Sequence, residues 1–207
     1  MRRLLLLLPI VVLLVGCGGD SGGGKKETVD CTIGGDESKA ELATLEEDKT
    51  YTVAVKTNKG DFRFELSTDI SPCTTASFVG LAQKGFFDGL TFHRIVPGFV
   101  IQGGDPNGDG TGGPGYSTVD TPPDDTTYDK GVVAMAKAGT DPAGTSGSQY
   151  FVVSADGVDL PPDYAVLGKV TDGIDVVEKI GRLGDENDPR GAPTERVVMK
   201  KVEVTSG

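Results

Sequence analysis

The segment Phe92-His-Arg-Ile-Val-Pro-Gly-Phe-Val-Ile-Gln-Gly-Gly-Asp105 is the most informative stretch of this 207-residue chain. Two short runs rich in apolar residues, 91–96 and 99–102, flank the dipeptide Pro97-Gly98. Because proline and glycine favour turns over regular structure, this pattern predicts two short strands joined by a turn.

Further strand candidates lie on both sides of this segment. Residues 52–57 and 61–66 alternate apolar and polar side chains, which is the period of half-buried strands. Asn58-Lys59-Gly60 between them predicts a hairpin turn. Four more apolar runs predict short strands at residues 132–135, 149–153, 165–170 and 197–204.

Two helices are expected among these strands. Ser71-Pro72 fits a helix N-cap followed by proline at the first helical position, and Gly85 fits the C-terminal stop of that helix. A second helix is predicted at residues 171–180. Its inward-facing side chains would be Ile174, Val177 and Ile180.

Eight short strands and two helices predict a mainly β fold: a closed eight-stranded antiparallel barrel capped by two α-helices. Closure is favoured because it removes exposed strand edges. A barrel of this size fills its interior with side chains, so we expect a binding site on the outer face or rim. The 31 glycines also favour loops and tight turns over a helical bundle.

The first 16 residues are predicted to be a signal peptide and are excluded from the fold. Arg2 and Arg3 precede an apolar stretch, 4–15, which is shorter than the roughly 20 residues of a membrane span. Leu14-Val15-Gly16-Cys17 resembles the bacterial lipobox, which implies cleavage before Cys17 and attachment of lipid to it. The alternative is an ordinary secretory signal with an incidental cysteine.

Residues 17–49 are then expected to be the lipidated Cys17 and a Gly-rich, charged linker, with a short helix as a candidate at 40–45. Residues 50–207 would form the folded domain. The expected location is the extracytoplasmic face of the cell membrane, with the lipid anchor as the contact to the membrane.

Charge and cysteine content exclude some classes of partner. The net charge of −11 argues against a nucleic-acid partner and against electrostatic docking on anionic lipid. A single histidine and the absence of a Cys-x-x-Cys motif argue against a metal site. Outside the cytoplasm Cys31 and Cys73 would meet an oxidising environment, so a disulfide between them is expected, with two free thiols as the alternative.

The segment 92–105 resembles the signature of the cyclophilin family almost residue for residue. Met135-Ala-Lys-Ala-Gly139 and Gly147-Ser-Gln-Tyr-Phe151 together resemble the second signature of that family. Tyr164-Ala-Val-Leu-Gly-Lys-Val170 resembles the strand before its last helix. The resemblance spans roughly residues 50–205. It implies an eight-stranded barrel with two helices and peptidyl-prolyl cis-trans isomerase activity without a cofactor.

Proline isomerisation needs neither a nucleophile nor a metal. The barrier of ~18–20 kcal/mol comes from amide resonance, so a catalyst must hold the proline ring and weaken the conjugation. The resemblance implies that Arg94 donates toward the prolyl nitrogen, that Gln102 orients Arg94 and that Phe99 helps to form the apolar pocket. Taken alone, Arg94 would be a surface arginine, and Phe99 would be core packing.

The resemblance also implies a set of substrate-binding positions. These are Val100, Ala136, Lys137, Gln149, Phe151, Leu160 and Tyr164. Three of them depart from common family residues: Val100 replaces methionine, Lys137 replaces asparagine, and Tyr164 replaces histidine. Ala136 and Lys137 would pair with the peptide through main-chain groups, which any side chain allows. The chain has no tryptophan near Asp159, so weak cyclosporin binding is expected.

We therefore expect a monomeric isomerase that acts on Xaa-Pro bonds of unfolded or loop-exposed extracytoplasmic polypeptides and assists their folding. The alternative is a lipoprotein or chaperone that binds proline-containing peptides without turnover.

Asp105-Pro-Asn-Gly-Asp-Gly110 begins like a calcium loop, but Tyr116 stands where glutamate is required. His93 is expected to be a packed structural residue.

Overall fold

The computed structural model describes residues 30–207. The predicted signal peptide, 1–16, and the predicted lipidation site, Cys17, lie outside the described residues. Within residues 30–207, no helix has both the length and the apolar composition required to cross a membrane.

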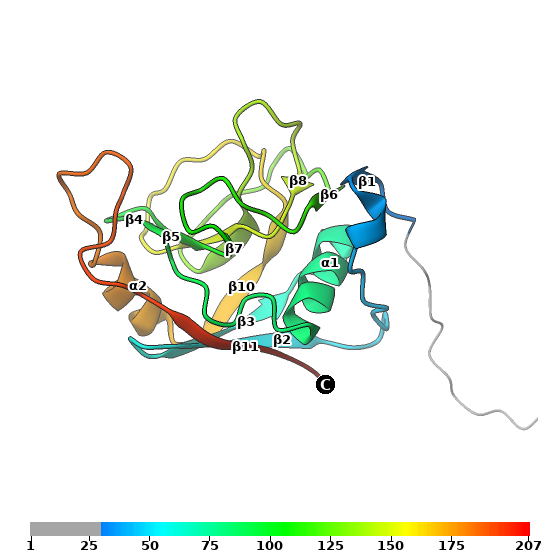
Figure 1. The fold of residues 1–207 in the computed structure, drawn as a ribbon, viewed down its shortest axis with the longest axis horizontal. Coiled ribbons are helices and arrows are strands. Elements are labelled where there is room, and N and C mark those ends of the chain that lie inside the picture. Colours follow the sequence, from blue (N-terminus) through cyan, green and yellow to red (C-terminus); the bar gives the residue numbers. More distant parts are fainter. Residues whose placement is uncertain (1–29) are drawn as a thin grey trace, which may run out of the picture.

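The main feature is one antiparallel sheet of eight strands (Figure 1). Its spatial order is β11-β2-β3-β10-β7-β9-β5-β4, and each strand overlaps one of the eight runs predicted from the sequence. The strands are β2 (Tyr51–Thr57), β3 (Asp61–Leu66), β4 (Arg94–Val96), β5 (Val100–Gly103), β7 (Val132–Met135), β9 (Tyr150–Val153), β10 (Val166–Asp172) and β11 (Met199–Ser206).

The prediction of a closed barrel is wrong, because the sheet is curled but open between β4 and β11. Residues 89–92 and 197–199 share main-chain hydrogen bonds there, but they form only an isolated bridge, Thr91 to Val198. Further along β4, the N–H of Ile95 donates 2.7 Å to the carbonyl of Gly191, which lies in the loop before β11. This loop therefore lies where β11 would have to pair with β4 to close the barrel.

The two helices lie on opposite sides of the molecule in Figure 1. Helix α1 (Pro72–Gln83) begins after Ser71 as predicted, and Gly85 follows it with the left-handed φ of 71°. Helix α2 (Ile174–Gly181) starts later than predicted because β10 continues to Asp172. Gly173, with φ of 77°, makes the turn between β10 and α2.

Strand alternation divides the apolar residues of β5, β7 and β9 between two clusters. Ile101, Val133 and Val152 point into the main core with the aromatic group around Phe78. The ring of Phe78 stacks on that of Phe87 at 4.7 Å and meets Tyr150 edge-on at 5.6 Å. The alternate residues form a second cluster on the other face of the sheet. The interior is therefore filled, and the second cluster is the surface available for a site.

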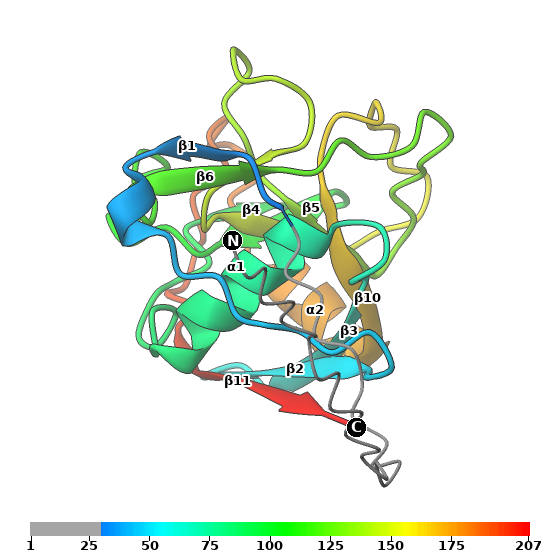
Figure 2. The same ribbon diagram turned by 90° about the vertical axis from the view of Figure 1, so that its right-hand side faces the viewer.

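A second sheet of three strands lies across α1 (Figure 2). It consists of β1 (Ile33–Gly35), β6 (Tyr116–Val119) and β8 (Thr145–Ser146). The expected linker 17–49 therefore includes an ordered segment, residues 31–46, which we call the strap. Its main chain packs on α1, where Ala43 N–H donates 3.0 Å to Ala76 and a Cβ at Gly80 would collide with the carbonyl of Glu41.

The short helix expected at residues 40–45 is absent from the strap. A 3₁₀ turn, η1 (Glu37–Lys39), precedes this stretch, and residues 40–46 run along α1 without regular secondary structure. The main-chain contacts with α1 favour a non-helical strap, since a helical turn would direct these groups to one another.

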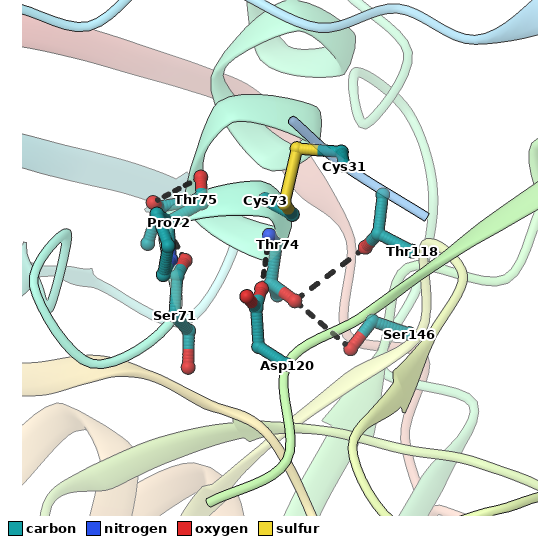
Figure 3. The surroundings of a disulfide bond; sticks show 9 residues. All are labelled: Cys31, Ser71, Pro72, Cys73, Thr74, Thr75, Thr118, Asp120 and Ser146. Carbon is teal, nitrogen blue, oxygen red and sulfur yellow. Dashed lines mark hydrogen bonds between the residues drawn. A yellow bond between two sulfur atoms is a disulfide. The ribbon is translucent and has the colours of Figure 1, made fainter. Parts of the chain in front are cut away.

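A disulfide joins Cys31 of the strap to Cys73 in the first turn of α1 (Figure 3). The adjacent Thr74 bonds to the sheet of three strands: its N–H donates 2.6 Å to the Asp120 carboxylate, and its hydroxyl donates 3.2 Å to Ser146. Asp120 thus caps α1, while the hydroxyl of the predicted N-cap, Ser71, forms no cap hydrogen bond. The disulfide attaches the strap beside this polar contact.

Replacing both Cys31 and Cys73 by serine should lower the stability of the folded domain. The bond closes a loop with a sequence separation of 42 residues. Loop-closure entropy gives ~3–4 kcal/mol for that length, or a fall of about 10 °C in melting temperature. Thermal melting checks the shift, and thiol titration of an unfolded, unreduced Cys17→Ser protein should detect no reactive thiol. Two titratable thiols in that protein would contradict the disulfide.

Candidate active site

Three side chains form a hydrogen-bonded chain across neighbouring strands. The guanidinium of Arg94 donates 3.3 Å to the side-chain oxygen of Gln102. The Gln102 amide donates 3.1 Å to Gln149, whose own amide donates 3.0 Å and 2.9 Å to the carbonyls of Gly110 and Gly112. Among the described residues, Gln102 is the only hydrogen-bond partner of the guanidinium. The chain therefore orients Arg94 while most of its donors stay available.

Strand register sets Arg94 beside an apolar surface. Arg94 lies opposite Gln102, and Gln102 lies opposite Phe151. Phe151 in turn lies opposite Ala134, so these four residues form one row on one face of the sheet. Neighbouring strands are about 4.8 Å apart, which puts the Cα atoms of Arg94 and Phe151 roughly 10 Å from each other. A long arginine side chain reaches the margin of the apolar cluster over that distance.

The apolar surface is the second cluster described above. Its buried members are Val100, Tyr128, Val132, Ala134, Phe151, Val153 and Val166. Phe99, Ala136, Val158, Leu160 and Tyr164 pack against them and are partly buried. The arrangement brings together the predicted pocket residues Phe99, Val100, Phe151, Leu160 and Tyr164. Beside an oriented cation, it forms a surface for an apolar ring.

Aromatic side chains form the wall of this cluster. The rings of Phe151 and Tyr164 meet edge-on at 5.4 Å, and Tyr128 meets Tyr164 edge-on at 6.0 Å. The Tyr128 hydroxyl donates 2.7 Å to the carbonyl of Tyr164 and accepts 3.0 Å from its N–H. Burial raises the pKa of Tyr128, which keeps the hydroxyl protonated. Sequence reasoning missed Tyr128, since it lies in a polar loop without a strand pattern.

Lys137 and Ala136 follow β7 at the edge of the site. The N–H of Ala136 donates 2.9 Å to the carbonyl of Gln149. Within residues 30–207, neither the N–H nor the carbonyl of Lys137 has a hydrogen-bond partner. Lys137 thus offers a main-chain donor and acceptor for a peptide, whereas the Ala136 N–H is used internally. A cavity of about 370 Å³, lined by Gln102, Gln149 and Lys137 among others, lies beside them.

The glycine-rich loop after β5 supports the arginine chain. The Asp105 carboxylate accepts hydrogen bonds from the N–H groups of Asn107 (2.8 Å), Asp109 (3.0 Å) and Gly110 (2.5 Å). These bonds occupy the carboxylate that a calcium ion would require, and they hold the Gly110 carbonyl toward Gln149. In the described part of the chain, no group of three or more potential ligands is placed to hold a metal ion.

His93 precedes Arg94 but shares none of its hydrogen bonds. Neither ring nitrogen has a partner among residues 30–207, and burial lowers the pKa of His93.

A larger cavity, about 540 Å³, lies between the strap and the start of α1 and contains none of the site residues.

The fold and site together define a class: a curled antiparallel sheet that presents an oriented arginine beside an apolar surface with aromatic side chains. Residues 52–204 match the family model described as "Cyclophilin type peptidyl-prolyl cis-trans isomerase/CLD". The chain belongs to the cyclophilin family and is a peptidyl-prolyl cis-trans isomerase.

Individual relatives agree with this assignment. Peptidyl-prolyl cis-trans isomerase B of Bacillus subtilis is 47% identical over 118 residues, covering 56% of this chain and 80% of the relative. The Helicobacter pylori isomerase is 41% identical over 140 residues, covering 66% and 83%. A crystal structure of a Cryptosporidium parvum cyclophilin matches with a TM-score of 0.67 and 29% identity, covering 76% of this chain and 99% of that chain.

The rate of isomerisation should be independent of pH between about 6.5 and 8.5. A guanidinium group does not lose its proton in proteins, glutamine side chains do not titrate, and burial lowers the pKa of His93, which leaves its ring neutral. The measurement is kcat/KM on an Xaa-Pro peptide across this range. A sigmoidal change with a midpoint near 7 would show that a titrating group takes part.

Proposed function

We propose that this isomerase acts on Xaa-Pro bonds of unfolded or loop-exposed polypeptides outside the cytoplasm and assists their folding. The observation that supports it most is the row Arg94–Gln102–Phe151, in which an oriented cation lies beside an apolar, aromatic surface. A related Cryptosporidium parvum cyclophilin, 30% identical to this chain, was crystallised in the presence of the dipeptide Ala-Pro. The family assignment favours catalysis over the alternative of peptide binding without turnover.

Peptide capture uses the pocket and the main chain of Lys137. The proline ring packs between Phe99, Phe151 and Tyr164, where burial of apolar surface favours binding. The unpaired N–H and carbonyl of Lys137 bond to the peptide main chain and fix its direction. These contacts hold one side of the susceptible bond while the other side rotates.

Arg94 supplies the contact that is specific to the transition state. In a planar amide the nitrogen lone pair is delocalised, so the nitrogen accepts hydrogen bonds poorly. As the bond twists, the lone pair returns to the nitrogen and the guanidinium gains an acceptor. Because Gln102 and Gln149 already orient the guanidinium, little reorganisation is required. The interaction therefore lowers the barrier more than it strengthens binding of the ground state.

Replacing Arg94 by alanine should reduce kcat on an Xaa-Pro peptide ten- to a hundredfold and change Kd little. The estimate follows from a charge-assisted hydrogen bond of roughly 1.5–3 kcal/mol, at 1.36 kcal/mol per decade. Exchange spectroscopy gives the rate, titration gives Kd, and thermal melting checks the fold. Arg63→Ala, at an exposed position on β3, is the matched control and should keep parental values. A folded Arg94→Ala protein with parental kcat would contradict the mechanism.

The location proposed for this enzyme is the extracytoplasmic face of the cell membrane, where it would act as a lipid-anchored monomer. The lipobox-like Leu14–Cys17 segment supports the anchor, and the disulfide between Cys31 and Cys73 is typical of an oxidising compartment. Residues 18–30, which lie between the predicted lipidation site and the strap, would be the tether.

Replacing Cys17 by serine should release the protein from the membrane fraction or block its processing. The lipid would have no attachment point, while the folded domain and its activity would be unchanged. Fractionation of expressing cells, followed by mass measurement of the membrane-bound parent, tests this. A Cys17→Ser protein that stays as firmly bound as the parent would exclude the lipid anchor.

A further inference from the structure

A buried ammonium lies at the edge of the site and is not used in the mechanism above. The side chain of Lys137 is only 4% exposed. Its Nζ lies 2.7 Å from the carboxylate of Asp163 and donates 3.0 Å to the carbonyl of Asp141. A buried charge is expensive to desolvate, and an ion pair repays this only when its geometry is good. The Lys137–Asp163 ion pair is therefore weak evidence for a contribution to stability, and a role in the site is the alternative.

The position of Lys137 connects two parts of the site. Its main-chain N–H and carbonyl are unpaired within the described residues, and Lys137 lines a cavity with Gln102 and Gln149. Its side chain extends to the loop that follows β9, where Asp163 precedes Tyr164 directly. The ammonium also lies 5.7 Å from the centre of the Tyr164 ring, within the range of a cation–π interaction.

Tyr164 is held from several directions. Phe151 meets its ring edge-on, and the Tyr128 hydroxyl bonds to both its N–H and its carbonyl. Phe151 and Tyr128 fix the ring and the main chain against the pocket floor. The Lys137 ammonium lies over this ring, and its ion pair with Asp163 connects it to the loop residue directly before Tyr164.

We propose that Lys137 is a positioning residue, which sets the Tyr164 ring as the wall of the proline pocket while its own main chain pairs with the peptide. This inference rests on the proposed function of the site. Lys137 would then connect the proline pocket, through Tyr164, to the subsite that binds the peptide main chain. Because the wall contacts the proline ring equally in the ground and transition states, its loss should weaken binding rather than slow the chemical step.

The test is the effect of Lys137→Met on isomerisation of an Xaa-Pro peptide. Methionine keeps the apolar stem but removes the ammonium. We expect KM to rise about five- to tenfold with kcat within about twofold of the parent. Lys130→Met is the matched control, because Lys130 pairs with Asp156 at the other end of the same loop and with Glu178 of α2. It should leave KM unchanged.

A double-mutant comparison shows whether Lys137 acts through Tyr164. In a Tyr164→Ala protein, adding Lys137→Met should change KM less than about twofold, since coupled residues are not additive. Lys137→Arg keeps a cation that can pair with Asp163, so it should restore at least part of the affinity. If Lys137→Met does not fold, Asp163→Asn breaks the same ion pair at a half-exposed position and should raise KM in the same direction.

An unchanged KM in folded Lys137→Met would overturn the proposal, as would an equal and independent effect in the Tyr164→Ala background. A fall in melting temperature without a change in KM would show an ion pair that serves only stability. If the parent itself fails to accelerate exchange, the proposed function fails instead, and the two results are distinguishable in one assay.

Discussion

The hydrogen-bond register of β4, β5 and β9 is the constraint on which both the core and the site depend. Residues opposite each other in these antiparallel strands point to the same face, so one register directs Ile101 and Val152 inward and Gln102 and Phe151 outward. A slip of one residue would exchange the two faces. The packing energy of the core therefore also fixes the position of Arg94 relative to the pocket.

The loops add a second level of positioning. Asp105 folds the glycine-rich loop so that the carbonyls of Gly110 and Gly112 receive Gln149. The same loop leads into β6, which β1 of the strap covers, and Asp36 N–H donates 3.1 Å to Gly115. The hydrogen bonds that orient Arg94 thus continue through Gln149 to the glycine-rich loop. This loop leads to the strap, which the disulfide attaches to α1.

Features encoded in local sequence could be predicted, and features made by distant main-chain contacts could not. Alternation predicted two of the strands and apolar runs predicted the other six, while the family resemblance implied a site with Arg94, Gln102 and Phe151, which the strand register places in one row. The strap was missed because its contacts with α1 are main-chain hydrogen bonds, which leave no side-chain pattern. The open edge of the sheet follows from the route of the loop through Gly191, and no periodicity encodes that route.

The same limit applies to individual side chains in the site. Tyr128 and Asp120 lie in polar loops, and their roles depend on which distant residues the fold brings to them. Lys137 was expected to contribute only main-chain groups, yet its side chain is buried against Asp163 and Tyr164. A charged residue in a sequence favours exposure, and only the fold shows the partner that allows burial.

Catalysis in this mechanism depends on an arginine that Gln102 orients and that stabilises the twisted amide. The most direct measurement is kcat and Kd for Arg94→Lys on an Xaa-Pro peptide. Lysine keeps the charge but lacks the planar fork that bonds to Gln102 and to the substrate together. If the oriented guanidinium is required, kcat should fall at least about tenfold while Kd stays within about twofold of the parent. A parental kcat would show that charge alone suffices, and it would contradict the role given to the oriented guanidinium.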